Sequence, residues 1–226
     1  MFAHIGHKYD IPELVCVTTP TLRTYETPAG NKYPSVTTVL SGAQDESKKK
    51  GLEEWRKRVG PEEAERISRV AANRGEEVHL IAERYLDNDP DWKKGIMPIN
   101  LLTFNDMRKT LDNNVNNIIA QEVPLYSDKL KTAGRVDLIA EWKGELAIID
   151  FKTSKRAKKK EWITSYFHQM SFYAAAFYER TGVAIKKGVI VMVTDDGECL
   201  VFEISTFEYL KEFIVIRKKF QELFNM

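Results

Sequence analysis

Residues 134–152, GRVDLIAEWKGELAIIDFK, carry the pattern that decides the fold. Two apolar stretches, 134–142 and 145–152, are joined by Lys143 and Gly144. A two-residue connection that contains glycine is typical of a tight turn between antiparallel strands. The segment therefore predicts a β-hairpin.

The register of this hairpin brings acidic side chains together. If Trp142 pairs with Glu145, Asp137 lies directly opposite Asp150. Lys152, two residues further on, projects from the same face as Asp150, because strand side chains alternate with a period of two.

Opposed carboxylates need a physical reason. Directly opposed side chains have Cβ atoms roughly 4.5–5.5 Å apart, and like charges at that separation are destabilising. A divalent cation between Asp137 and Asp150 would remove the repulsion. The alternative is a charged strand face on which Arg135 neutralises Asp137, and the hairpin alone does not decide between the two.

Composition describes a globular protein. The chain has 226 residues, of which 43% are hydrophobic and 30% charged, and this size suits one domain with a helical elaboration. The formal net charge of +1 argues against bulk attraction to nucleic acid but not against a local patch. One such patch is the basic run of residues 155–160, KRAKKK, directly after the hairpin.

Several protein classes are disfavoured. Cys16 and Cys199 are too few for a disulfide framework or a four-cysteine iron–sulfur cluster, and they favour a reducing compartment. No apolar run approaches membrane-spanning length, and the first residues carry no import signal. We therefore expect no membrane partner and a cytoplasmic location, with a mitochondrial one disfavoured.

The remaining pattern predicts a mixed sheet with helices on both faces. We expect an N-terminal hairpin from strands at residues 22–27 and 32–38, and helices at 46–59, 61–72, a third one that begins at Arg74 and ends before Asp87, and 101–118. Strands should follow at 120–126, 133–142 and 145–152, then a helix at 161–180, strands at 187–193 and 198–204, and a helix at 207–224.

Three further side chains attract attention. His79 shares a helical face with Glu76 and Glu83, although a lone helical histidine is more often a surface residue. Gln169 lies in an otherwise apolar and aromatic helical stripe with Tyr173 and needs a polar partner, for which a metal-bound water or a phosphate would serve.

Together these elements resemble the RecB-like branch of the PD-(D/E)XK nucleases. The motifs occur in the order Gly75…His79, Glu122, Gly134…Asp137, Asp150-Phe151-Lys152 and Gln169…Tyr173. Residues 33–40, YPSVTTVL, are similar to the segment that precedes the core in mitochondrial genome maintenance exonucleases and their phage relatives. The resemblance implies a restriction-endonuclease-like α/β core at residues 120–226, a helical insert at 45–119 and an N-terminal hairpin region at 1–44, all in one nuclease domain.

The resemblance also implies roles for individual residues. Asp137, Asp150 and Lys152 would be catalytic, with Lys152 orienting the attacking water. Mg²⁺ or Mn²⁺ would be bound by His79, Asp137, Asp150 and the carbonyl of Phe151, and relatives vary in whether the residue equivalent to Glu122 reaches the metal. DNA contacts are expected from Ser35, Thr37, Arg74, Thr153, Ser154, Gln169, Tyr173, Lys158, Lys159 and Lys160.

The implied activity is metal-dependent exonucleolytic hydrolysis of linear single-stranded DNA, in phage or bacterial replication, recombination or repair and alongside proteins of those processes. Two alternatives stay open at this point. One is a structure-specific endonuclease for flaps or junctions, which would use the same catalytic residues. The other is a catalytically silent DNA-binding module, which has no need for opposed carboxylates.

Overall fold

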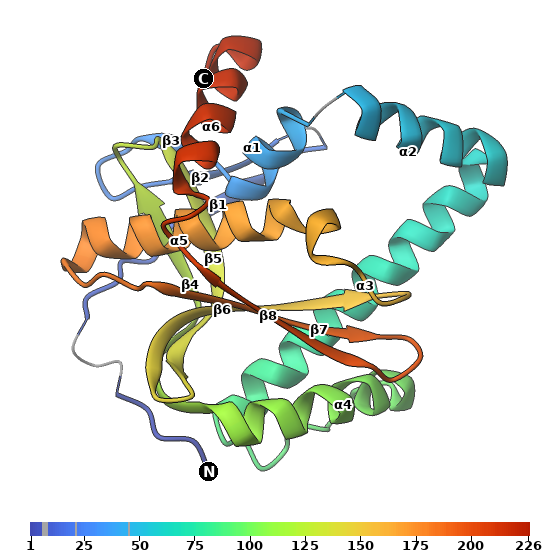
Figure 1. Ribbon diagram of the computed structural model, residues 1–226, viewed down its shortest axis with the longest axis vertical. Coiled ribbons are helices and arrows are strands. Elements are labelled where there is room, and N and C mark those ends of the chain that lie inside the picture. The colour runs from blue at the N-terminus through green and yellow to red at the C-terminus, as the bar shows by residue number, and fades with distance from the viewer. Residues whose placement is uncertain (6–8, 21, 45) are drawn as a thin grey trace.

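The computed structural model describes residues 1–5, 9–20, 22–44 and 46–226, with residues 46–49 described by their backbone alone. A five-stranded sheet has the order β4-β5-β6-β7-β8, and a smaller N-terminal sheet has the order β1-β2-β3 (Figure 1). The strands are β1 Val15–Thr18, β2 Arg23–Glu26, β3 Lys32–Pro34, β4 Val115–Ser127, β5 Thr132–Trp142, β6 Glu145–Ser154, β7 Lys187–Thr194 and β8 Cys199–Ser205. The helices are α1 Val36–Gly42, α2 Glu46–Val59, α3 Pro61–Leu86, α4 Pro98–Asn114, the short 3₁₀ helix η2 Lys160–Trp162, α5 Thr164–Thr181 and α6 Leu210–Phe224.

The large sheet is mixed, as the sequence predicts. β4, β5 and β6 are antiparallel, β6 and β7 are parallel through the α5 crossover, and β7 and β8 are antiparallel. The hairpin register is confirmed, because Trp142 pairs with Glu145 and Leu138 with Ile149. Both faces of β6 are apolar and buried, which is typical of a strand covered by helices on two sides.

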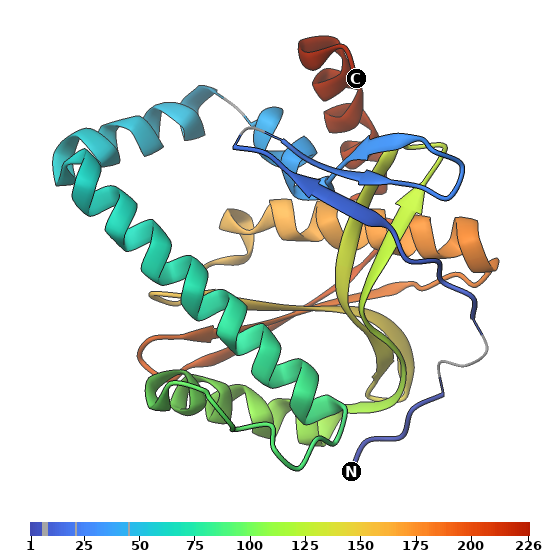
Figure 2. The ribbon, with the colours of Figure 1, turned by 180° about the vertical axis from the view of Figure 1, so that it is seen from behind.

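Two apolar layers cover the sheet (Figures 1 and 2). Helices α1, α5 and α6 pack on one face, where Ile139 and Ile148 contribute to the core. Helices α3 and α4 pack on the other, where Leu138 and Ile149 contribute. Successive residues of β5 and β6 therefore face opposite layers. Helices α3 and α5, which belong to different layers, both approach the part of the sheet where β5 begins and β6 ends.

The N-terminal region differs from the predicted hairpin. A third strand, β1, adds to β2, and the chain leaves strand conformation after Pro34 instead of continuing to residue 38. The Ser35 side chain accepts a hydrogen bond from the Thr38 N–H at 3.0 Å, so it caps α1. Local capping by serine thus outweighs the strand propensity of the β-branched residues that follow.

The helical insert also differs from the prediction. The expected helices at 61–72 and from Arg74 onward form the single helix α3, with Gly75 in its interior. The helix expected to reach residue 118 ends at Asn114, because Val115 already pairs with Trp142 of β5. Sheet pairing, which is a tertiary contact, decides where α4 ends.

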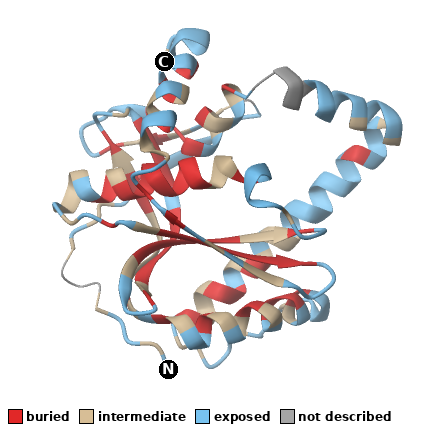
Figure 3. Cartoon of the chain, viewed as in Figure 1, coloured by how far each residue is buried: buried red, intermediate tan, exposed pale blue. Residues whose placement is uncertain are grey.

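Helix α3 runs through two environments. Its second half buries Val78, Ile81, Ala82 and Leu86, whereas Ala64 is the one buried side chain that the structure describes between residues 50 and 74. We call α2 together with residues 61–74 the projecting arm. Figures 1 and 3 show it extending from the body with mostly exposed side chains.

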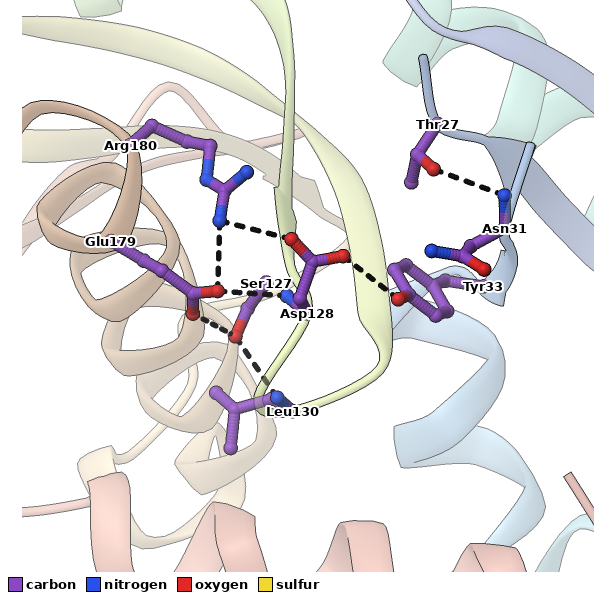
Figure 4. A network of polar contacts seen from close by, with 8 residues as sticks. All are labelled: Thr27, Asn31, Tyr33, Ser127, Asp128, Leu130, Glu179 and Arg180. Atoms are coloured by element: carbon purple, nitrogen blue, oxygen red, sulfur yellow. Dashed lines mark hydrogen bonds and ion pairs between the residues drawn. The ribbon is translucent and has the colours of Figure 1, made fainter. Parts of the chain in front are cut away.

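A polar network fastens the N-terminal sheet to the main body (Figure 4). The Tyr33 hydroxyl donates to Asp128 Oδ1 at 2.8 Å, and Arg180 of α5 pairs with Asp128 Oδ2 at 3.1 Å. Ser127 donates to Glu179 Oε2 at 2.6 Å. Because Ser35 also forms a β-bridge with Ala133, the start of α1 is held against the start of β5.

Within the described residues, no helix combines the length and apolarity needed to cross a bilayer.

Candidate active site

A cavity of about 480 Å³ opens where α3, α1, α5 and the N-terminal sheet meet strands β4 to β6. Its lining combines acidic, basic and hydroxyl side chains with apolar surface from residues such as Val36 and Leu80. The lining residues are Arg23, Tyr25, Ser35, Val36, Thr37, Gly75, Glu76, His79, Leu80, Glu83, Glu122, Gly134, Arg135, Asp137, Lys152, Gln169 and Tyr173. The predicted motifs, which are dispersed along the sequence, therefore converge on one place.

The pairing of β5 with β6 ends just before Asp137. The last pair between β5 and β6 is Leu138 with Ile149. Asp137 and Asp150 were predicted to lie directly opposite each other, but the strand pairing does not reach them. Instead, the Phe151 N–H donates to Asp137 Oδ2 at 2.8 Å. β6 stays paired with β7 along this stretch, and on its β5 side the Asp137 carboxylate takes the place of a backbone acceptor for the Phe151 N–H.

Pairing is also interrupted on the β4 side. Gln121 pairs with Leu138 and Val123 with Val136, but Glu122 between them has φ +47°. A non-glycine residue in the left-handed region costs on the order of 1–3 kcal/mol and persists only where its surroundings enforce it. Arg135 Nη1 contacts the Glu122 carbonyl oxygen and helps to hold this conformation.

His79, Glu122 and Asp137 form a group suited to a metal ion, with one ligand atom from each lying within 4.8 Å of the others. His79 Nδ1 is 3.6 Å from Asp137 Oδ2 and 3.8 Å from Glu122 Oε1. Ligand atoms around an octahedral Mg²⁺ are roughly 3 Å apart when adjacent and roughly 4 Å apart when opposite. The spacing and the N/O donor set therefore fit a divalent cation.

The second nitrogen of His79 has a different task. His79 Nε2 lies 2.8 Å from the Phe151 carbonyl oxygen, which can only accept. Nε2 therefore carries the proton, and Nδ1 faces the carboxylates as a potential ligand. A backbone carbonyl that fixes the tautomer of a histidine is the usual partner of a metal-binding imidazole. The Phe151 carbonyl, which was predicted to bind the metal directly, accepts a hydrogen bond from His79 in this structure.

Asp150 lies next to this group. Its side chain is fully buried, neither carboxylate oxygen is hydrogen-bonded to a described residue, and Oδ2 forms an ion pair with the Lys152 ammonium group. Burial raises the pKa of Asp150 to about 6, against the effect of Lys152. Oδ1, which is buried and has no partner among the described residues, is a second feature that fits a cation.

The electrostatic balance explains the charge state of the two basic groups. Burial would lower the pKa of His79, but the carboxylates of Asp137 and Glu122 outweigh it and raise the value to about 9. Burial would also lower the pKa of Lys152, and Asp150 and Asp137 raise it instead. In the metal-free protein, both cations therefore compensate the acidic cluster.

Gln169 and Tyr173 form the floor of the cavity. The Gln169 amide donates to the Tyr173 hydroxyl at 3.0 Å, which donates to the Arg135 carbonyl at 2.6 Å. Within the protein, the polar partner of Gln169 is thus Tyr173, and a contact of Gln169 with a phosphate stays a prediction. A Cβ at Gly134 would lie 3.0 Å from both Tyr173 Cε1 and Val36 Cγ1, which explains the glycine three residues before Asp137.

The other predicted DNA contacts fall into three groups. Ser35 and Thr37 line the cavity, and their hydroxyl groups lie 2.9 Å apart. Thr153 lies beside Gly75, whereas the buried Ser154 donates to the Arg156 carbonyl at 2.8 Å.

Arg74 and the three lysines do not line the cavity. Arg74 pairs with Asp195 of the β7–β8 turn, so its guanidinium is engaged within the protein. Lys158, Lys159 and Lys160 lie in the loop before α5, near the rings of Tyr166, Trp162 and Phe167 respectively.

The sequence interpretation missed Arg23 and Tyr25, and it gave Arg135 only a role in neutralising Asp137. Arg23 and Tyr25 reach the cavity from β2, and no motif marked them. Arg135 lies two residues before Asp137 on the same strand, so the period of two could have indicated that it shares the cavity.

Comparison with known proteins defines the class. The family model of the PD-(D/E)XK nuclease superfamily matches residues 52–208, which include the metal-binding group, the Asp150-Phe151-Lys152 motif and Gln169. The chain belongs to this superfamily, and both the fold and the family predicted from the sequence are confirmed.

One curated relative is the human protein mitochondrial genome maintenance exonuclease 1, which is 26% identical over 176 residues. The match covers 74% of this chain and 51% of the relative, so the chain spans about half the length of that protein. Among solved structures, a "Putative exonuclease" from Eubacterium rectale is similar with a TM-score of 0.41 and 13% identity, covering 66% of this chain and 63% of the other. The protein SSO0001 is similar with a TM-score of 0.34 and 18% identity, covering 66% and 70%.

Proposed function

We propose that the protein is a divalent-metal-dependent exonuclease that degrades linear single-stranded DNA from an end. The observation that carries the proposal is the convergence of His79, Glu122, Asp137 and Lys152 on one cavity, with Asp150 buried in an ion pair with Lys152. A binding module gains nothing from a cluster of three carboxylates, whereas a cation that promotes phosphodiester hydrolysis binds at such a place.

Mg²⁺ or Mn²⁺ fits the donor set. His79 through Nδ1, Asp137 and Glu122 would bind the ion, with Asp150 as a further oxygen ligand from β6. When bound, the cation supplies charge stabilisation of the phosphodiester and lowers the pKa of a water molecule. The Phe151 carbonyl contributes by fixing the orientation of His79.

The remaining side chains position the substrate. Lys152 ends at the cavity, and its ammonium group orients the attacking water and offsets the negative charge that develops on the phosphate. Arg23 and Arg135 add positive charge to the cavity wall, and the exposed Thr37 hydroxyl can donate to a phosphate oxygen. Tyr173 and Gln169 fix the shape of the cavity floor through their hydrogen bonds.

The preference for single strands and free ends rests on the shape of the insert. The projecting arm continues the same helix that carries His79, so a strand that reaches the metal group must pass beside this arm. The exonuclease activity in the name of the human relative supports end-dependent cleavage. Its genome-maintenance name supports a role in replication, recombination or repair, with proteins of those processes as partners.

The test uses one single-stranded sequence as an end-labelled linear molecule and as a ligated circle, each with Mg²⁺, Mn²⁺ or chelator. We expect metal-dependent loss of the linear form and survival of the circle. Asp150→Asn is the control for contaminating nuclease. Cleavage of the circle at the linear rate would replace the proposal by the endonuclease alternative, and cleavage in chelator would remove the metal from it.

Salt dependence gives a second measurement. Each phosphate neutralised on a single strand contributes a slope of about −0.7 to the logarithm of binding against the logarithm of salt concentration. Reversing the charges of Lys158, Lys159 and Lys160 should flatten this slope. Reversal of Lys218, which is exposed on the distant helix α6, is the control.

A further inference from the structure

Trp162 is the most exposed aromatic side chain that the structure describes. Its relative exposure is 62%, and it lies in η2 between the basic run and α5. A tryptophan normally contributes a large buried apolar area, so its packing in this fold does not explain the residue at this position.

The loop holds Trp162 in a defined place. The Trp162 N–H donates to the Lys159 carbonyl at 3.0 Å, and the next residue, Ile163, is 1% exposed and anchored in the core. At the other end of the loop, Ser154 donates to the Arg156 carbonyl. A ligand that contacts this ring therefore meets a largely preorganised surface, which lowers the entropic cost of binding.

Positive charge surrounds the ring and continues toward the active site. Lys159 Nζ lies 5.7 Å from the centre of the Trp162 ring. Lys158 Nζ lies 5.8 Å from the centre of the Tyr166 ring, and Lys152 Nζ lies 5.1 Å from the centre of the same ring. Tyr166 thus lies between the basic run and Lys152, and Trp162 follows the basic run just outside the residues that line the cavity.

This combination favours one class of ligand. A flat exposed ring among cations suits a polyanion that also presents flat aromatic faces, and single-stranded nucleic acid has both. A duplex keeps its base faces stacked inside. A protein partner is less suited, because the neighbours Lys159, Lys160 and Glu161 are exposed and charged instead of forming an apolar patch.

We propose that Trp162 is a base-stacking residue that holds an unpaired nucleotide of the substrate next to the basic run, outside the metal cavity, while the basic run neutralises the adjacent phosphates. The inference rests on the proposed function and deepens it, because it assigns single-strand selection to a residue outside the metal centre. Trp162 acts on binding of the strand and takes no part in the chemical step.

The experiment measures binding in the cleavage-deficient Asp150→Asn background. The probes are a 20-nucleotide oligothymidine and the same backbone with abasic sites throughout. Stacking contributes about 1–3 kcal/mol per base, which corresponds to a roughly 5- to 140-fold increase in Kd for Trp162→Ala. Trp162→Phe should restore part of the affinity, and Phe207→Ala, which removes an aromatic ring of 54% exposure far along the sequence, is the matched control.

The abasic probe separates stacking from charge. Trp162→Ala should weaken binding of oligothymidine and leave binding of the abasic strand unchanged. Equal loss on both probes, or no loss on either while the parent protein binds, overturns the inference. Cleavage by the chain with native Asp150 and Trp162→Ala is measured in parallel.

The parallel cleavage assay distinguishes failure of the stacking role from failure of the proposed function. If the native chain cleaves linear DNA and Trp162→Ala changes neither KM nor Kd, the stacking role alone is wrong. If the native chain neither cleaves nor binds the oligonucleotide, the proposed function and the inference are both wrong. An increase in KM at unchanged kcat, confined to single-stranded substrate, supports the inference.

Discussion

The β5–β6 hairpin and the projecting arm differ in how far they bury their side chains. Strands β5 and β6 bury most of their side chains, including Asp137 at 9% exposure and Asp150 at 0%. The arm exposes nearly all of the side chains that the structure describes in it, although its second helix is continuous with the segment that carries His79. The comparison shows that one helix can supply both a rigid ligand and an exposed extension, because only half of it packs on the sheet.

The difference has an energetic consequence. In the hairpin, charges are far from water and their interactions are strong, so single changes should affect activity and stability greatly. In the arm, solvent screens the charges, and ion pairs such as Arg66 with Glu63 should contribute little. Four experiments test this contrast.

The largest effect is expected in the catalytic motif. Asp150→Asn and Lys152→Met should each reduce the cleavage rate by about 100- to 1000-fold or more, because the first removes a proposed metal ligand and the second removes the positive charge that faces the reacting phosphate. Glu145→Gln, at the exposed start of the same strand, should retain the native rate. An Asp150→Asn protein that cleaves at the native rate would remove this motif from the site.

Asp150→Asn also tests the metal-free fold. Because its folded-state pKa of about 6 exceeds its ordinary value of 3.8, the stability that Asp150 contributes is fully present below pH 3.8 and is lost as the pH rises through 6. At pH 8 the neutral asparagine should therefore match or exceed the native Tm without metal. The Tm increase caused by Mn²⁺ should shrink in the same variant.

The next effect concerns metal binding by His79. The imidazole must lose its proton to bind a cation, and its pKa is about 9, so affinity for Mn²⁺ should rise by about tenfold per pH unit between pH 7 and 9. Calorimetry in buffers of different ionisation enthalpy should detect one released proton. His79→Gln should abolish that release, and His168→Gln should not.

The same group predicts the pH dependence of the metal-free protein. The folded-state pKa of His79 lies above its ordinary value of 6.5, so its contribution to stability is fully present below pH 6.5 and is lost as the pH rises through 9. Thermal unfolding in chelator between pH 6 and 10 measures this loss. A pH-independent Mn²⁺ affinity would contradict the assignment of His79 as a ligand.

Substitutions at two glycines should change the free energy of unfolding by smaller amounts and in opposite directions. Gly134→Ala should destabilise the protein by about 1–3 kcal/mol, because the new Cβ would lie 3.0 Å from Tyr173 and Val36. Gly51→Ala, in the exposed helix α2 with no atom within 4 Å of its Cβ, should stabilise by about 0.5–1 kcal/mol. Chemical denaturation measures both, and changes of equal sign would contradict the contrast between the two regions.

The smallest effect is expected where the arm meets the body. Arg74 pairs with Asp195, whose side chain is 43% exposed, so the coupling energy of Arg74→Met with Asp195→Asn should stay below about 1 kcal/mol. A double-mutant cycle of unfolding free energies measures it. A coupling of several kcal/mol would mean that the arm is fixed as rigidly as the hairpin.

Local patterns in the sequence identified the hairpin, its register and the order of the motifs. The apolar alternation and the Lys143-Gly144 turn decide which residues of β5 and β6 face each other, since a shift of one residue would turn every side chain to the wrong face. The same reasoning located Asp137, Asp150 and Lys152, because all three lie within one locally determined unit.

Tertiary structure decided what local patterns could not. The end of the β5–β6 pairing before Asp137 and the left-handed backbone of Glu122 are features of the contacts between strands, which no local pattern marks. The partner of Gln169, the end of α4 and the engagement of Arg74 with Asp195 depend on residues distant in the sequence. Periodicity reports which face of an element is apolar, whereas these features depend on which other element covers that face.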